Sequence, residues 1–200
     1  MDRKEGMHMK LTEILDQMHL DAMLITNPYN MRYVSHFRGG EGILLISRKS
    51  RVLITDSRYT EAAKQESDFQ VEECNHLRKT TDILNDWIER EQLLTVGYED
   101  ASMLCSTFRE YQTGLPAIKE WIPLGVAVTR LRQIKTPEEI GYLRQAEAIG
   151  DAAFTKILDI IKPGMTELEI QAELEYRMMK CGASGTSFDT IVASGIHSSM

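Results

Sequence analysis

The chain has 200 residues, of which 42% are hydrophobic and 26% charged, and its formal net charge is −7. A chain of this size can bury a core without disulfides or metal, whereas its acidic balance argues against sequence-independent nucleic-acid binding and against a polybasic membrane anchor. Its longest aliphatic run, residues 43–46, is much too short to span a bilayer. The composition therefore predicts a globular protein that binds neither nucleic acid nor membrane.

The cysteines indicate a reducing compartment. Cys74, Cys105 and Cys181 are odd in number and far apart, which matches neither a disulfide framework nor a zinc ribbon. Reduced thiols are typical of a cytoplasmic protein. Residues 1–9 lack the apolar stretch of a secretory signal. We interpret them as a frayed arm before a fold that begins near Lys10.

The first part of the chain alternates apolar runs of strand length with stretches of helical periodicity. This alternation predicts a layered α/β domain over residues 10–132, with a mixed sheet and flanking helices. The expected elements are a helix over 10–20, a strand over 22–25, a helix over 28–37, a hairpin of strands over 43–46 and 52–55, a helix over 58–65 capped by Asp56, a strand over 69–73, a helix over 80–89, a strand over 93–98, a helix over 103–111 and a strand over 118–122.

After a short helix within 126–134, the pattern changes to long helices, and we place a domain boundary near residue 133. Thr136, Pro137 and Glu139 combine an N-cap, a proline at the first helical position and a capping-box glutamate. A second capping box starts at Thr166. The expected elements over 133–200 are a helix of about 25 residues from 137, a helix over 167–180 and a strand over 188–193.

No self-contained catalytic motif is present in the residues. The sequence lacks an H-E-x-x-H zinc helix, a phosphate-binding loop, a G-x-G-x-x-G turn and a G-x-S-x-G elbow. The five histidines have no metal-ligand spacing. The glycine-rich stretch 39–42 precedes a strand rather than a helix, so it is a loop without anion-binding geometry.

Four landmarks do occur in order along nearly the whole chain. Together they resemble the creatinase/prolidase family, whose members are Xaa-Pro dipeptidases and Xaa-Pro aminopeptidases. The landmarks are residues 30–35 (NMRYVS) with 40–42 (GEG) and 55–59 (TDSRY), then 132–140 (RQIKTPEEI), 161–167 (IKPGMTE) and 187–195 (SFDTIVASG).

The resemblance implies a creatinase-like N-terminal α/β domain, followed by the first helices and strand of an incomplete α+β pita-bread domain. It implies a peptidase that hydrolyses the bond before proline in short peptides, acts as a homodimer and uses two divalent metal ions (manganese, cobalt or zinc). In the family, two aspartates, a histidine and two glutamates hold these ions, and they lie beyond the turn at Ser194–Gly195. We therefore expect this chain alone to bind no metal and to be inactive.

The resemblance leaves Phe188 and Ile191 as candidate substrate-binding residues, because they occupy a strand that borders the substrate pocket in the family. The alternative for both is core packing, since buried sheets also use such apolar residues. We interpret Asp189 as a strand-end hydrogen-bonding residue rather than a metal ligand. His197 lies too close to Gly195 to be the family's substrate-contacting histidine, so we assign it to a surface loop. No catalytic residue is assigned.

Asp56 and Arg58 have two interpretations. The resemblance allows them to reach the active site of a neighbouring subunit. An aspartate that caps a helix and pairs with a nearby arginine is the simpler interpretation.

Three functions remain open at this point. The chain can belong to a proline-specific peptidase, to a metal-free pseudo-peptidase that serves as a binding module, or to a non-peptidase, creatinase-like hydrolase. The match at residues 132–140 and the acidic charge favour the peptidase. The residues do not choose between dipeptidase and aminopeptidase activity.

Overall fold

A computed structural model describes residues 3–199. The chain forms two compact units, Met1–Ile134 and Lys135–Met200. Within residues 3–199, no helix is both long enough and apolar enough to cross a membrane.

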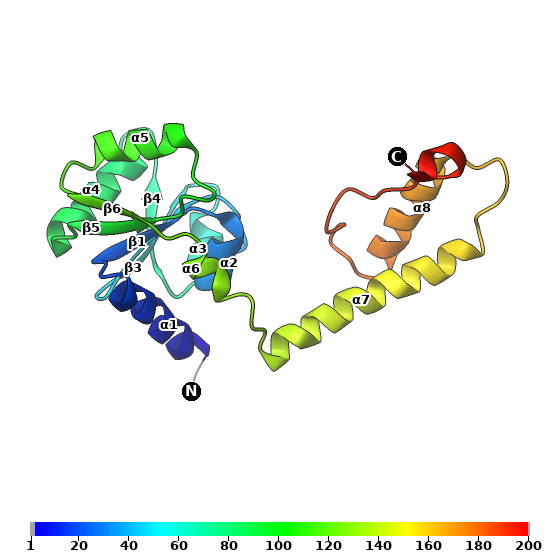
Figure 1. Ribbon diagram of the computed structural model, residues 1–200, viewed down its shortest axis with the longest axis horizontal. Coiled ribbons are helices and arrows are strands. Elements are labelled where there is room, and N and C mark those ends of the chain that lie inside the picture. The colour runs from blue at the N-terminus through cyan, green and yellow to red at the C-terminus, as the bar shows by residue number, and fades with distance from the viewer. Residues whose placement is uncertain (1–2, 200) are drawn as a thin grey trace. The chain divides into compact units, whose positions relative to one another are not determined.

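The first unit is built on one mixed sheet with helices on both faces (Figure 1). The strand order is β4-β3-β2-β1-β5-β6, with β2 antiparallel to both β1 and β3 and the remaining pairs parallel. This arrangement confirms the predicted α/β fold class. The strands are β1 (Ala22–Ile25), β2 (Ile43–Ser47), β3 (Arg51–Asp56), β4 (Gln70–Cys74), β5 (Thr95–Tyr98) and β6 (Glu120–Pro123).

The helices of this unit cover two separate hydrophobic cores, one on each face of the sheet. Because neighbouring residues of a strand point to opposite faces, Leu44 and Leu53 enter one core while Leu45 and Val52 enter the other. The helices are α1 (Arg3–Gln17), α2 (Pro28–Ser35), α3 (Thr60–Glu66), α4 (Thr80–Glu91), α5 (Cys105–Gly114) and α6 (Ala127–Arg130).

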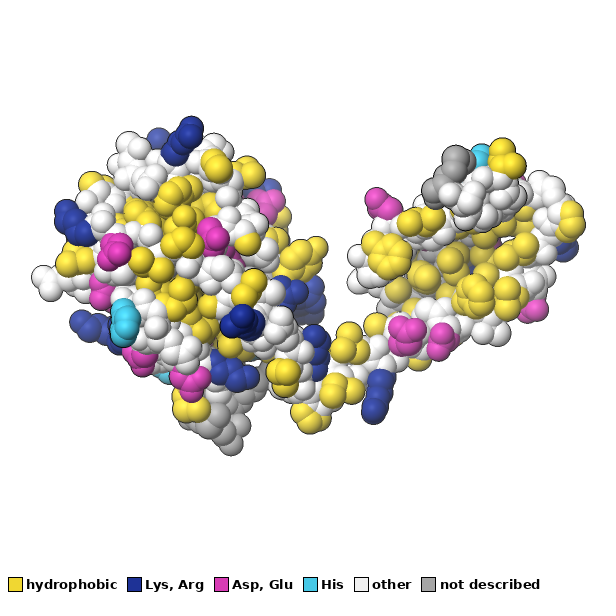
Figure 2. Space-filling view, viewed as in Figure 1, with side chains coloured by type: hydrophobic (Ala, Val, Ile, Leu, Met, Phe, Trp, Pro, Cys, Tyr) yellow, Lys and Arg dark blue, Asp and Glu magenta, His cyan; other side chains and the backbone are white. Residues whose placement is uncertain are grey.

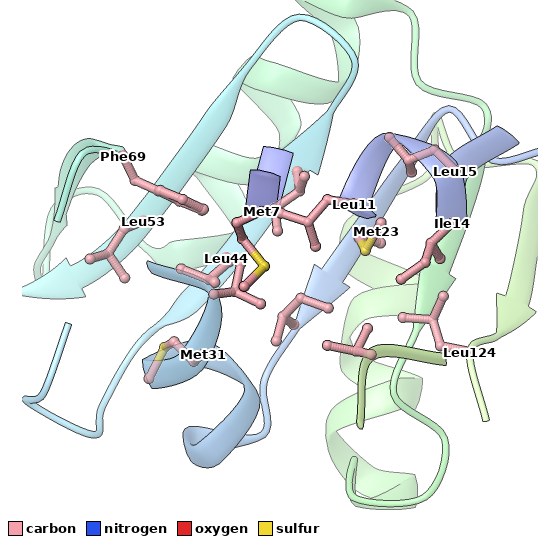
Figure 3. Packing of buried hydrophobic residues seen from close by; sticks show 14 of the residues in the cluster. Met7, Leu11, Ile14, Leu15, Met23, Met31, Leu44, Leu53, Phe69 and Leu124 are labelled. Atoms are coloured by element: carbon pink, nitrogen blue, oxygen red, sulfur yellow. The ribbon is translucent and has the colours of Figure 1, made fainter. Parts of the chain in front are cut away.

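The predicted frayed arm over residues 1–9 is wrong for the part that the structure describes. Helix α1 begins at Arg3, seven residues before the predicted start at Lys10. Met7 is only 9% exposed and packs in the same core as Leu11, one helical turn later (Figure 3). This burial accounts for the longer helix, since tertiary packing of an apolar face supplies most helix stability.

The second unit is a pair of helices, α7 (Pro137–Leu158) and α8 (Glu167–Lys180), followed by a short 3₁₀ helix, η1 (Gly195–Ser199). Both predicted capping boxes are present: Thr136 and Glu139 exchange hydrogen bonds at the start of α7, and Thr166 and Glu169 do so at the start of α8. The start of α7 is further stabilised by Pro137, whose ring fixes φ at the first helical position.

The predicted strand over 188–193 is wrong, because this segment is irregular in the structure. A strand needs the backbone of a neighbour to satisfy its N–H and C=O groups. All six strands found within residues 3–199 belong to the sheet of the first unit. The apolar sequence of 188–193 is therefore compatible with a strand but has no strand partner here.

We predict that the two units differ in hydrogen exchange. Ala153 and Ile157 are the buried hydrophobic residues that the structure describes in the second unit, whereas α4 of the first unit buries Ile83, Leu84, Trp87 and Ile88 against the sheet. Helices with little packing open locally at low free-energy cost. Amides of α7 and α8 should therefore exchange faster than those of α4, as measured by mass spectrometry or NMR. Equal protection of α7 and α4 would contradict this expectation.

Candidate functional site

The two residues predicted to bind substrate lie at a groove in the second unit. The groove has a volume of about 890 Å³ and lies between α7, α8 and the segment 182–191. Phe188 and Ile191 are among its lining residues and are 73% and 83% exposed, so neither is packed into a core. Leu143 and Met178 supply part of its apolar wall. The groove can receive an apolar group, and its use by a substrate stays a prediction.

His197 does not line this groove and is hydrogen-bonded to Glu167. Its Nδ1 atom lies 3.1 Å from Glu167 Oε1, at the start of α8. The backbone N–H of Ser194 donates to the same oxygen at 2.7 Å. These two hydrogen bonds, the one from Ser194 first, lower the pKa of Glu167 below its ordinary value. Glu167 thus ties the segment after residue 193 to α8, and Asp189 is exposed beside the groove.

No metal site is formed by the residues that the structure describes. Within 3–199, no three His, Cys, Asp or Glu side chains come close enough together to hold a metal ion. Zinc sites and paired-metal sites need at least three protein ligands that converge. The residues present do not fit the two metal ions that the resemblance implies, so no catalytic step is assigned to metal here.

Asp56 and Arg58 form a surface ion-pair cluster with Glu41. Arg58 donates from its backbone N–H and from Nε to Asp56 Oδ1, at 2.9 and 3.0 Å, and from Nη2 to Asp56 Oδ2 at 2.7 Å. The same Nη2 donates to Glu41 Oε2 at 2.5 Å. The hydrogen bonds from Arg58 lower the pKa of Asp56. This arrangement is the ion pair of the simpler interpretation.

Asp56 does not, however, cap helix α3. The predicted helix start near Arg58 is wrong, because α3 begins at Thr60, and Tyr59 is its N-cap without a side-chain hydrogen bond. The Asp56 carboxylate instead closes the turn onto the N–H of Arg58, while its backbone carbonyl accepts from Thr60 Oγ1 at 3.0 Å. Both carboxylate oxygens of Asp56 accept hydrogen bonds from Arg58 instead.

Sequence reasoning missed a buried carboxylate at the end of the sheet. Glu99 is 4% exposed and directly follows β5, while Thr26 and Asn27 directly follow the parallel neighbour β1. Glu99 Oε2 accepts from the backbone N–H groups of Thr26 and Asn27, each at 2.6 Å, and Oε1 accepts from Asn30 Nδ2 at 2.7 Å. A buried charge is tolerated only when it is hydrogen-bonded in this way.

This carboxylate fixes the orientation of Asn30 and, through it, of Arg132. An ionised carboxylate only accepts hydrogen bonds, so the Asn30 amide nitrogen must face Glu99 and the amide oxygen must face away. Asn30 Oδ1 accepts from Arg132 Nη1 at 2.9 Å, and Tyr33 Oη donates to the Leu131 carbonyl at 2.9 Å. Arg132, the first residue of the landmark 132–140, therefore contacts Asn30, the first residue of the landmark 30–35.

Comparison with known proteins decides the family. Residues 8–134 match the Creatinase/Prolidase N-terminal domain, which is more than half of the chain. The chain belongs to the creatinase/prolidase family. Residues 141–200 match metallopeptidase family M24.

Several relatives of this creatinase/prolidase chain are peptidases. It is 40% identical to an uncharacterized peptidase of Bacillus subtilis (strain 168), over 96% of this chain and 54% of that protein. It is 31% identical to the Xaa-Pro dipeptidase of Pyrococcus horikoshii, over 96% of this chain and 52% of that protein. The structure of the Xaa-Pro dipeptidase from Bacillus anthracis superimposes with a TM-score of 0.89 at 35% identity, over 98% of this chain and 54% of that one. The chain thus spans about half the length of the relatives it matches.

We predict that Glu99 stabilises the N-terminal domain of this creatinase/prolidase chain. Glu99→Gln replaces an acceptor oxygen with an NH₂ group that must face either the two backbone donors or Asn30 Nδ2. A buried donor left facing donors costs about 2–4 kcal/mol of unfolding free energy, measurable by urea denaturation. Glu89→Gln, at an exposed position on α4, is the matched control and should change stability by less than about 0.5 kcal/mol. Equal stability of the two variants would contradict the role of the network.

Proposed function

We propose that the protein carrying this chain is a proline-specific metallo-exopeptidase, of the Xaa-Pro dipeptidase or Xaa-Pro aminopeptidase type. The observation that carries the proposal is the match to the Xaa-Pro dipeptidase from Bacillus anthracis, which covers 98% of this chain at 35% identity. The match to metallopeptidase family M24 over residues 141–200 supports the same reaction class.

The proposed substrates are short proline-containing peptides. Proline has no N–H and its ring fixes φ, so a peptidase that binds this N–H or needs another backbone shape excludes such peptides. More of the lining surface of the groove in the second unit is apolar than polar, which suits a pyrrolidine ring. We propose that Phe188 and Ile191, which line the groove between α7 and α8, contact the substrate.

The proposed chemistry needs two divalent metal ions, of manganese, cobalt or zinc, which supply hydroxide near neutral pH. The described residues offer no metal site, so the proposal gives this chain a supporting role. Several large apolar side chains of α7 and α8, including Phe154, Leu158 and Leu168, are more than half exposed. Figure 2 shows hydrophobic side chains gathered on one face of this helical pair. We propose that the rest of the catalytic domain packs on this face.

The same proposal places the enzyme in the cytoplasm. Cys74, Cys105 and Cys181 are all unpaired in the structure. Free thiols persist where the environment is reducing, whereas secreted proteins of this size tend to pair them.

We expect the 200-residue chain alone to lack peptidase activity. The purified chain is incubated with Mn²⁺ or Co²⁺ and with a dipeptide ending in proline, or a tripeptide with proline second. No metal-dependent release of the first residue is expected, because without bound ions no hydroxide is generated at neutral pH. A protein of about twice this length, as in the relatives, should release it and should lose this activity with a chelator.

Two controls sharpen this assay. Replacing proline by alanine in each peptide should abolish release by the longer protein. Cleavage of the dipeptide alone identifies a dipeptidase, and cleavage of the tripeptide alone identifies an aminopeptidase. Chelator-sensitive cleavage by the 200-residue chain would contradict the supporting role, and a longer protein that cleaves neither peptide would contradict the proposed function.

We also propose that the protein is a homodimer, as the family resemblance implies for the N-terminal domain. Sedimentation velocity of the 200-residue chain should show a dimer whose fraction rises with concentration into the high micromolar range, because association follows mass action. A single species with the mass of the monomer across this range would contradict a dimer contact made by this chain.

A further inference from the structure

The segment that Asn30 anchors borders a strongly basic pocket in the first unit. The pocket has a volume of about 400 Å³, and no acidic residue is among the residues that line it. Figure 2 shows Lys and Arg side chains gathered beside the region of α2 and α6. The lining residues are Tyr29, Arg32, Tyr33, His36, Arg38 and Arg132.

The local backbone brings these arginines together. Asn27 caps α2 by accepting from the N–H groups of Tyr29 and Asn30, and Pro28 opens the helix. Arg32 lies in the last turn of this helix. His36 ends the helix in the left-handed conformation, with φ of 64°, so the chain turns sharply before Arg38. Arg32 and Arg38 thereby line the same pocket although the helix ends between them.

One of the three arginine charges is already compensated. Glu66, on α3, accepts from the backbone N–H of Arg38 at 2.8 Å and from its Nε at 3.2 Å, and it forms an ion pair with Arg38 Nη2 at 3.2 Å. Within residues 3–199, no carboxylate pairs with Arg32 or Arg132. The pocket therefore carries two positive charges that the described residues do not balance.

Arg132 is held in place before any ligand arrives. Its Nη1 donates to Asn30 Oδ1, and its guanidinium lies 5.6 Å from the centre of the Tyr29 ring. Asn30 is 3% exposed and is itself fixed by Glu99 and by Thr129 Oγ1, at 2.7 and 3.2 Å. A guanidinium has five N–H donors, and the bond to Asn30 uses one of them. A positively charged group positioned by buried partners loses little side-chain entropy when it binds an anion.

We propose that this pocket binds a doubly charged oxyanion of the phosphate class, with Arg32 and Arg132 as its main ligands. The charge of such an anion balances the two uncompensated guanidinium groups. A tetrahedral phosphate presents oxygens in several directions, so it can accept hydrogen bonds from two guanidinium groups at once. A carboxylate has two oxygens in one plane, and a single guanidinium group can bind both. This proposal does not depend on the proposed peptidase function, because every residue of the pocket lies in the first unit.

The test is an NMR titration of the ¹⁵N-labelled 200-residue chain with inorganic phosphate, at pH 7.5 and at an ionic strength held constant with KCl. Saturable shifts confined to the amides of α2 and of residues 129–132 are expected. Shifts that do not saturate, or that spread over exposed arginines throughout the chain, would show general screening and would overturn the proposal. A parallel titration with acetate separates the two oxyanion classes, and acetate binding as tight as phosphate binding would also overturn it.

Variants then assign the ligands. Arg32→Gln and Arg132→Gln should each weaken phosphate binding at least about tenfold, the loss expected for one charge-assisted hydrogen-bonded pair. Arg109→Gln, at an exposed position on α5, is the matched control and should change the affinity less than twofold. If Arg132→Gln does not fold, because it also loses the bond to Asn30, then Arg32→Gln decides the question. Unchanged phosphate affinity in Arg32→Gln would refute the site.

Discussion

The burial of one carboxylate organises the carboxyl ends of the neighbouring parallel strands β1 and β5. Glu99 is removed from water at the end of β5, and its charge is tolerated because two backbone N–H groups and one side-chain amide converge on it. The two N–H groups belong to the turn between β1 and α2. The position of α2, with its cap at Asn27 and its landmark residues 30–35, therefore depends on a residue about 70 positions away in the sequence.

Features that depend on neighbouring residues could be predicted from the sequence, whereas features that depend on distant residues could not. The strands over 22–25 and 43–46 are continuous apolar runs, and both long helices of the second unit begin with a capping box, so each could be predicted from neighbouring residues. Met7 was missed because residues 1–9 are mostly polar apart from their methionines, and only the tertiary core shows that Met7 is buried. The segment 188–193 was wrongly predicted as a strand because its residue types suit a sheet, whereas pairing requires a partner that no local pattern reports.

The candidate sites also differ in how far the sequence could predict them. The sequence resemblance identified Phe188 and Ile191, and the structure places both at one groove, although their contact with substrate is still a proposal. The ion pair of Asp56 and Arg58 was foreseeable, since the residues are two apart. The hydrogen bonds from Thr26 and Asn27 to Glu99 span 73 and 72 residues, and the bond from Arg132 to Asn30 spans 102. No spacing rule for helices or strands connects residues at such separations, so this network and the arginine pocket beside it emerge only from the fold.

The same network defines where the chain leaves the first unit. The segment 129–132 is attached to α2 at three points: Thr129 Oγ1 accepts from Asn30, the Leu131 carbonyl accepts from Tyr33, and Arg132 donates to Asn30. These attachments end two residues before Ile134, the last residue of the unit. The exit point is thus fixed by hydrogen bonds within the first unit, independently of where the second unit lies. Because Arg132 serves both as an anchor of this exit and as a wall of the basic pocket, an anion bound there would act on the one segment that connects the N-terminal domain to the helices that follow.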